Sequence, residues 1–214
     1  MKALALLSGG KDSFLAAQIA LEQGYEIEAA LTVIPEEFSM MFHYPNAAKA
    51  EQVAALLGLQ WYTTCESKFP SAIENFVERG VGAVISGAIA SDYQKTRIER
   101  ICTRLGIESY APLWRKDQKS VLDEILLRGI EAMIVSVSAE GFDDDDLGRI
   151  INENYIEVLQ NKNLKYGINV TGEGGEYETF VLGCRGCKRL EVTKFKKVWE
   201  GSHGYYVIEE LEMK

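Results

Sequence analysis

Hydrophobic and polar positions follow a strand–helix rhythm along the first half of the chain, from Lys2 to about Tyr110. Short apolar runs predict strands, and apolar residues three or four positions apart predict helices between them. The predicted strands are Ala3–Leu7, Glu28–Ile34, Trp61–Thr64, Ala83–Ser86 and a short piece near Ser109, and the predicted helices are Ser13–Gln23, Ala47–Leu57, Pro70–Arg79 and Asp92–Leu105. This alternation predicts an α/β fold with a parallel, doubly wound sheet, which binds ligands beyond the carboxyl ends of its strands.

Beyond Pro112 the pattern changes, so we divide the chain into a domain over residues 1–112 and a smaller α+β lobe over residues 113–214. The predicted elements there are a helix at Asp117–Arg128, a strand at Met133–Val137, a helix around Arg149–Asn161, and a terminal hairpin of Arg189–Trp199 and Tyr205–Glu212. Four consecutive aspartates, 143–146, lack the spacing of a calcium loop, so we expect them to cap a helix and to compensate its dipole.

The segment Ser8-Gly9-Gly10-Lys11-Asp12-Ser13 joins the first predicted strand to the first predicted helix. A helix N-terminus carries outward-facing N–H groups and partial positive charge, and two glycines let an anion approach closely. Ser8 and Ser13 add hydroxyl donors, and Lys11 adds a charge that we expect to face solvent. Neither a Walker P-loop nor a dinucleotide fingerprint has this spacing. The segment therefore predicts a site for a phosphate chain, the alternative being a glycine turn capped by Ser8 or Asp12.

Composition limits the classes of function. The chain has 214 residues, 47% of them apolar, and a net charge of −9, which argues against broad attraction to nucleic acid. The basic concentration at Arg185–Lys197 is best explained as a solvated strand face. No apolar run approaches the about 20 residues of a membrane span, and no signal-peptide core precedes Ser8. We therefore expect a cytoplasmic protein that binds neither membranes nor nucleic acids.

The four cysteines do not complete a metal site. Cys184 and Cys187 form a C-x-x-C pair without a second pair or a nearby histidine. We expect a tight turn between strands there, with a redox or sulfur-carrying role as the alternative. Cys102 lies on the apolar stripe of its helix and is predicted to be a core residue.

A second distinctive segment, which we expect to form an acidic loop, is Gly172-Glu-Gly-Gly-Glu-Tyr-Glu-Thr-Phe180. Three glycines bring the backbone close to another group, and three carboxylates within six residues repel one another unless a cation or proton is shared. A third segment runs from Ser86 to Gln94 and is followed by Arg97, Cys102, Gly106 and Pro112-Leu113-Trp114. In that segment Ser91 and Gln94 have the spacing of a capping box. Arg97, Arg100 and Arg104 share one side of the predicted helix, either as a solvated face or as a phosphate clamp.

Together and in this order, the three segments resemble the diphthine–ammonia ligase (diphthamide synthase) family of the N-type ATP pyrophosphatases. The resemblance implies ATP-dependent amidation of diphthine on translation elongation factor two, with ammonium as the nitrogen source and AMP and pyrophosphate as products of an acyl-adenylate route. It also implies ATP and Mg²⁺ as cofactors. Neither membrane nor nucleic acid is an expected partner, and a homo-oligomer is compatible with the sequence.

The resemblance also implies roles for residues. Ser8, Gly9, Gly10, Lys11, Asp12, Ser13 and Gly87 would bind ATP, with Lys11 neutralising the leaving pyrophosphate and Asp12 binding the metal. Glu176 would be catalytic with Lys11 and Asp12, and the substrate-binding residues would be Glu173, Glu176, Tyr177, Glu178 and Tyr93. Aromatic faces and carboxylates suit the trimethylammonium group of diphthine or ammonium. The alternative for Tyr177 and the three glutamates is that they only order the 172–180 loop. The alternative role of Tyr93 and Trp114 is packing. His43 is either a structural residue or a contact to the nucleotide.

Two other functions use the same phosphate loop. A tRNA-modifying ATP pyrophosphatase, of the thiolation or lysidine type, would adenylate a base, with Cys184 and Cys187 as sulfur carriers. A non-catalytic ATP-binding regulator would bind ATP without forming AMP. The acidic balance and the 172–180 segment argue against the first.

Overall fold

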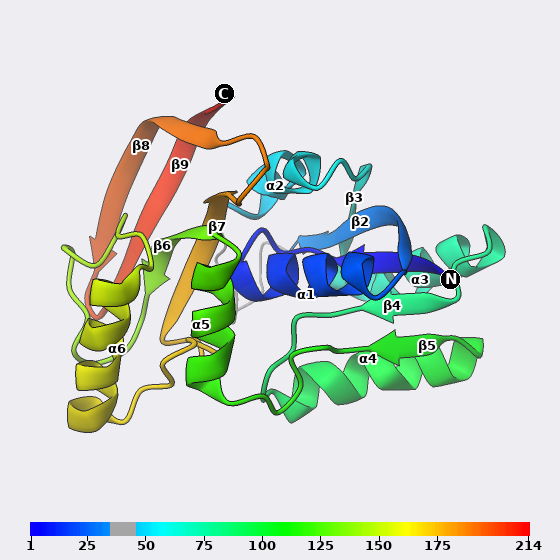
Figure 1. Cartoon of the computed structure of the whole chain (residues 1–214), viewed down its shortest axis with the longest axis horizontal. Coiled ribbons are helices and arrows are strands. Elements are labelled where there is room, and N and C mark those ends of the chain that lie inside the picture. The colour runs from blue at the N-terminus through cyan, green and yellow to red at the C-terminus, as the bar shows by residue number, and fades with distance from the viewer. Residues whose placement is uncertain (35–45) are drawn as a thin grey trace. The chain divides into compact units, whose positions relative to one another are not determined.

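The first compact unit, Met1–Trp114, is built on a parallel five-stranded sheet (Figure 1). The computed structural model describes residues 1–34 and 46–214. The strands lie in the order β3-β2-β1-β4-β5, and their bounds are β1 Lys2–Leu6, β2 Glu26–Ile34, β3 Trp61–Cys65, β4 Ala83–Ile85 and β5 Glu108–Tyr110. All neighbouring pairs are parallel, so the carboxyl ends of the strands share one edge of the sheet.

Helices cover this sheet in the manner that its apolar strands require. The helices are α1 Lys11–Glu22, α2 Ala50–Leu56, α3 Phe69–Glu78 and α4 Asp92–Leu105, with short 3-10 turns at Ala47–Lys49 and Glu66–Lys68. Apolar residues of α3 and α4 form one core with Leu4, Leu31 and Val84 of the sheet. Phe14 and Leu15 of α1 are fully buried. The predicted α/β class with a parallel, Rossmann-like sheet is confirmed.

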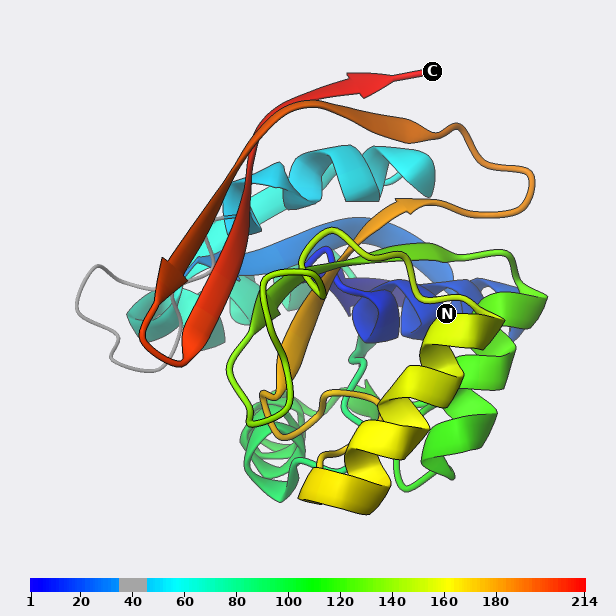
Figure 2. The ribbon, with the colours of Figure 1, turned by 90° about the vertical axis from the view of Figure 1, so that its left-hand side faces the viewer.

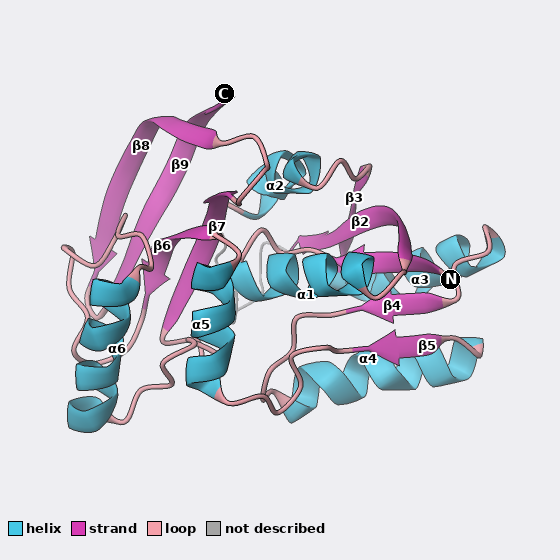
Figure 3. Cartoon of the chain, in the orientation of Figure 1, coloured by secondary structure: helices cyan, strands magenta, loops and turns pink. Residues whose placement is uncertain are grey.

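The second compact unit, Arg115–Lys214, contains an antiparallel sheet in the order β7-β6-β9-β8 (Figure 3). Its elements are α5 Gln118–Leu127, β6 Glu131–Val137, α6 Glu153–Tyr166, β7 Tyr177–Gly183, β8 Leu190–Glu200 and β9 His203–Met213. Figures 1 and 2 both show α5 and α6 side by side. The predicted α+β character of this lobe and its terminal hairpin are confirmed.

Two sequence predictions in the second unit are wrong. The segment 172–180 is not a loop throughout, because its second half opens β7 and pairs with β6. The helix predicted from Arg149 begins only at Glu153, where Asn152 caps it by accepting a hydrogen bond from the Tyr155 N–H. Residues before that cap are held in extended form, since Ile150 bridges to Met133 of β6.

The consecutive aspartates do not cap a helix either. Asp146 is buried and accepts from the Tyr155 hydroxyl at 2.6 Å, and it pairs with the Lys162 ammonium at 2.8 Å. Burial, followed by the contact with Asp146, raises the pKa of Tyr155 far above its ordinary value. These contacts tie the loop before α6 to the helix itself, so Asp146 is a packing residue of the second unit, whereas residues 143–145 are exposed.

Among the described α-helices of the first unit, α4 alone begins with a side-chain cap. Ser91 caps α4 by accepting from the Gln94 N–H at 3.3 Å, which is one of the two bonds of the predicted capping box. Asn46 occupies the N-cap position of the 3-10 turn at Ala47–Lys49, but its side chain makes no capping bond to the described residues of that turn. Across the described ranges, none of the helices combines the length and apolarity that crossing a lipid bilayer would demand.

Candidate functional site

The predicted phosphate loop, residues 8–13, follows the carboxyl end of β1 and leads directly into α1. Gly9 has a φ of 88°, a left-handed conformation that favours glycine, and Gly10 is the N-cap of the helix. The two serine hydroxyls hold the turn. Ser13 Oγ donates to the Gly10 carbonyl at 3.0 Å and accepts from the Ser8 N–H at 3.2 Å, and the two hydroxyls lie 3.1 Å apart. Ser8 and Ser13 therefore shape the loop before any ligand arrives.

Lys11 is buried, at 2% exposure, which corrects the expectation that it faces solvent. Its ammonium lies 2.8 Å from Oδ2 of Asp12, whose side chain is 23% exposed. Asp12 belongs to the first turn of α1 rather than to its cap, so the alternative that it caps the helix is wrong. The loop thus holds a desolvated positive charge beside a carboxylate at a helix N-terminus, where a negative ligand is favoured.

Gly87 brings the end of β4 against the first turn of α1. A Cβ at this position would lie 2.6 Å from both the Asp12 carbonyl carbon and the Ser13 nitrogen, and 2.8 Å from the Asp12 oxygen. Real Cβ atoms do not approach backbone atoms so closely. Gly87 was predicted to contact ATP, and the geometry gives it a definite task, since it lets two backbones meet where the phosphate loop begins.

The donor set of this loop fits a magnesium-bound triphosphate. A helix N-terminus, a buried lysine and a carboxylate suit an anion carrying a hard cation. No group of three or more His, Cys, Asp or Glu side chains in the described chain is arranged to hold a metal on its own. A metal held at Asp12 would therefore take its other ligands from phosphate oxygens and water, as Mg²⁺ usually does.

The second predicted site centres on the turn that precedes β7. Oε1 of Glu176 accepts from the Asn169 N–H at 2.7 Å, while Oε2 is buried and has no hydrogen-bond partner among residues 1–34 and 46–214. A Cβ at Gly174 would lie 2.7 Å from Oε1, so the glycine makes room for this carboxylate. Ser138 holds the same turn, because its N–H donates to the Glu176 carbonyl at 2.9 Å and its hydroxyl to the Gly175 carbonyl. A carboxylate oxygen buried without a donor disfavours the fold and suits a cation.

Tyr177 does not fit its predicted role in holding a cation. Its side chain is buried at 2% exposure, its hydroxyl donates to the Val170 carbonyl at 2.7 Å, and its ring packs against Phe142. We correct it to a residue that fixes the 169–176 turn. Glu173 and Glu178 are half-buried.

The remaining predicted residues differ in exposure and in their partners. Tyr93 is 67% exposed at the start of α4, so its alternative as a packing residue is wrong. Arg100 and Arg104 are exposed, whereas Arg97 pairs with Glu66. Trp114 carries the Lys95 ammonium over its ring at 5.0 Å. His43 lies outside the described residues.

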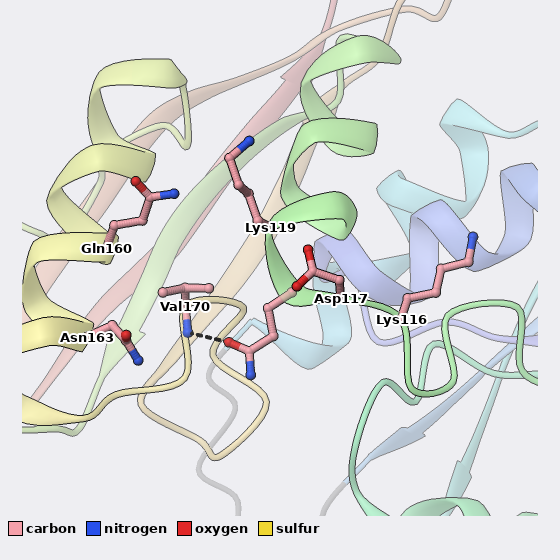
Figure 4. A pocket seen from close by; sticks show the side chains of 7 residues that line it. Lys116, Asp117, Lys119, Gln160, Asn163 and Val170 are labelled. Carbon is pink, nitrogen blue, oxygen red and sulfur yellow. Dashed lines mark hydrogen bonds between the residues drawn. The ribbon is translucent and has the colours of Figure 1, made fainter.

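A polar cavity of about 450 Å³ opens within the second unit, between α5 and α6 (Figure 4). Val170 forms part of its wall, and the Val170 N–H donates to the Gln118 side-chain oxygen at 3.1 Å. The segment that forms this wall also carries Asn169, the partner of Glu176. The cavity is lined by Lys116, Asp117, Gln118, Lys119, Gln160, Asn163 and Val170. It can accommodate a small polar group or a short stretch of peptide.

Sequence reasoning missed the residues that support the turn before β7. Asn169, Ser138 and Gln118 each anchor the turn before β7, yet none lies in a motif. Their partners are distant in sequence or belong to the backbone, so a single sequence carries no periodic signal for them.

A parallel sheet with this glycine-rich loop after its first strand is typical of PP-loop ATP pyrophosphatases. The family model of the diphthamide synthase N-terminal domain matches residues 1–109, and that of the C-terminal domain matches residues 117–213. The chain therefore belongs to the diphthamide synthase family.

Curated relatives agree with this assignment. The chain is 33% identical over 230 residues to a diphthine–ammonia ligase of Schizosaccharomyces pombe, covering 95% of this chain but only 38% of that protein. It is 34% identical over 218 residues to the diphthine–ammonia ligase of Homo sapiens, covering 86% of this chain and 79% of that one. Among solved structures, a predicted subunit of tRNA methyltransferase from Methanocaldococcus jannaschii has 16% identity and a TM-score of 0.44, covering 86% of this chain and 97% of the other.

Proposed function

We propose that this protein is a diphthine–ammonia ligase, which uses ATP and ammonium to convert diphthine on translation elongation factor two into diphthamide, in the cytoplasm. The match of both family domains along the chain carries this proposal. The buried Lys11 beside Asp12 at the start of α1 supports it, because this pair suits a leaving pyrophosphate.

A carboxylate does not react with ammonia directly, because oxide would have to leave from its carbon. The diphthine carboxylate first attacks the α-phosphate of ATP, forming an acyl-adenylate and releasing pyrophosphate. Ammonia then attacks the acyl carbon, and AMP leaves as the amide forms. The loop from Ser8 to Ser13, with Gly87 behind it, would bind the phosphates, and Lys11 would offset the charge that grows on the departing pyrophosphate. A magnesium ion at Asp12 would supply further stabilisation of that charge.

Glu176 is proposed to act on the acceptor side of the reaction. Its buried Oε2 receives no hydrogen bond from the part of the chain that the structure describes, so a cation would remove an unfavourable feature of the folded protein. Ammonium, the trimethylammonium group of diphthine or the amine that gains charge during attack all fit this requirement. Glu173, Glu178 and the exposed Tyr93 are proposed substrate contacts, Tyr93 through its ring face.

The test is pyrophosphate release measured with purified protein, ATP, Mg²⁺ and ammonium. We expect that release requires elongation factor bearing diphthine. Mass spectrometry should show that this factor loses about 1 Da as its carboxylate becomes an amide. Release that requires tRNA would instead indicate a base-modifying pyrophosphatase. ATP binding without release in either case would indicate a regulator.

A further inference from the structure

The turn between β7 and β8 holds a pair of cysteines that the proposed ligase reaction does not use. Cys184 and Cys187 form a disulfide, with their Cα atoms 5.2 Å apart. Both residues are half-buried, and the two residues between them are exposed. The expected tight turn is therefore present, and it lies at the surface of the second unit.

The turn is held by hydrogen bonds that do not depend on the sulfur–sulfur bond. The Cys187 N–H donates to the Cys184 carbonyl at 3.1 Å, and the Arg185 N–H donates to the Arg128 carbonyl at 3.1 Å. Gly186 has a φ of 79°, which glycine adopts readily, and Gly183 bridges to Arg189 across the base of the turn. Because the disulfide closes only a short loop, it adds little to the constraint that these contacts already impose. Breaking it should leave the backbone in place.

The turn that carries the pair is positively charged, although the whole chain has a net charge of −9. The six residues from Cys184 to Arg189 contain three cations and no carboxylate. Arg189 is paired with Glu131, whereas Arg185 and Lys188 make no ion pair within the described chain and are exposed. Neighbouring cations favour the thiolate, which is the form that attacks a disulfide. They also attract anionic reactants.

From these observations we propose that Cys184 and Cys187 form a reversible thiol–disulfide exchange site that selects anionic low-molecular-weight thiols and disulfides. In the oxidative direction, a thiolate of the pair attacks a small disulfide RSSR, forming a mixed disulfide and releasing RS⁻. The second thiolate then displaces the other RS⁻, so two electrons pass from the protein to RSSR. The two protons of the original thiols are taken up by the released thiolates.

The remaining cysteines provide an internal comparison. Cys102 is 1% exposed, and burial raises the pKa of its thiol to about 11. Cys65 is half-buried, with its sulfur 3.2 Å from the Ser67 hydroxyl, and has no second cysteine beside it among the described residues. A Cys65→Ser background therefore leaves Cys184 and Cys187 as the reactive pair.

The experiment measures oxidation of the reduced, folded Cys65→Ser protein by glutathione disulfide, which is anionic, and by cystamine, which is cationic. Maleimide labelling and intact mass follow the loss of two thiols. We expect full reduction by dithiothreitol without denaturant, and oxidation by glutathione disulfide about three- to tenfold faster than by cystamine at low salt, after correction for their intrinsic reactivities with a model dithiol peptide. High salt should shrink this preference. Cys184→Ser and Cys187→Ser should stop at the mixed disulfide.

Charge variants make the test specific. Arg185→Glu/Lys188→Glu should invert the preference, whereas Lys68→Glu/Arg100→Glu, which changes the net charge equally at exposed sites of the first unit, should keep it. A disulfide that resists dithiothreitol until the protein unfolds would overturn the proposal, because the bond would then be a structural staple. Equal corrected rates with the two disulfides, or no effect of the charge reversal, would overturn the selectivity.

Discussion

Replacement of Gly87 by alanine tests whether the end of β4 positions the phosphate loop. The new Cβ would sit 2.6 Å from two backbone atoms of α1, whereas ordinary contact begins at 3.4 Å. The two backbones must therefore separate by about 0.8 Å, the difference between those distances. Backbone atoms cannot rotate away as a flexible side chain does, so the strain moves the first turn of α1.

The expected losses can be estimated from this displacement. Overpacking of this kind destabilises a protein by about 1–3 kcal/mol, and each kcal/mol lowers Tm by about 2–4 °C in a chain of this size. A misplacement approaching 1 Å can lower a reaction rate by about 100-fold. We therefore expect Gly87→Ala to fold with a moderately lower Tm, to bind ATP more weakly and to release pyrophosphate far more slowly.

Gly82→Ala is the matched control, at the opposite end of the same strand. Its Cβ would meet the Met1 side chain at 3.2 Å, and Met1 is 58% exposed and free to swing away. This variant should therefore stay close to the unmodified protein in ATP affinity by calorimetry, in Tm by thermal denaturation and in the rate of pyrophosphate release. If Gly87→Ala matched the control in Tm, ATP affinity and rate, the reasoning about backbone approach would be refuted.

Three further substitutions separate stability from chemistry. Lys11→Met keeps most of the buried stem and removes the charge, so pyrophosphate release should fall by about 100-fold or more. Its Tm should fall less than that of Lys11→Ala, which also opens a cavity worth about 2 kcal/mol. Normal release by Lys11→Met would refute the leaving-group role. Glu176→Gln should leave ATP affinity unchanged and should raise or preserve Tm, because it removes the charge of a carboxylate whose buried oxygen has no donor among the described residues. The variant should nevertheless fail to form amide in a single turnover. A lower Tm with normal amidation would assign Glu176 to structure alone. Tyr155→Phe should lower the free energy of unfolding in denaturant titrations by about 1.5–3 kcal/mol, because it removes a hydrogen bond to the carboxylate of Asp146. ATP affinity should not change. An unchanged free energy of unfolding would show that this contact does not support the second unit.

Local sequence signals were sufficient for the elements of the first unit. Alternating apolar runs and helical spacing predicted each of its strands and its parallel class, because a strand buried on both faces and a helix with one apolar stripe leave distinct periodic patterns. Ser91 before its helix predicted a cap for the same local reason. The glycines and serines of the phosphate loop were recognisable because the chemistry there comes from consecutive residues.

The tertiary structure decided whatever depends on partners far along the chain. Burial of Lys11 results from packing around α1, which no local pattern reports. Tyr177 was assigned to a ligand although its hydroxyl reaches the Val170 carbonyl, and Asp146 was assigned to a cap although Tyr155 and Lys162 surround its carboxylate. A side chain's type sets which partners it accepts, whereas the fold decides which partner comes within reach. The sequence by itself therefore determined the sheet and the phosphate loop, and only the folded chain revealed the buried carboxylate oxygen of Glu176 and the close approach at Gly87.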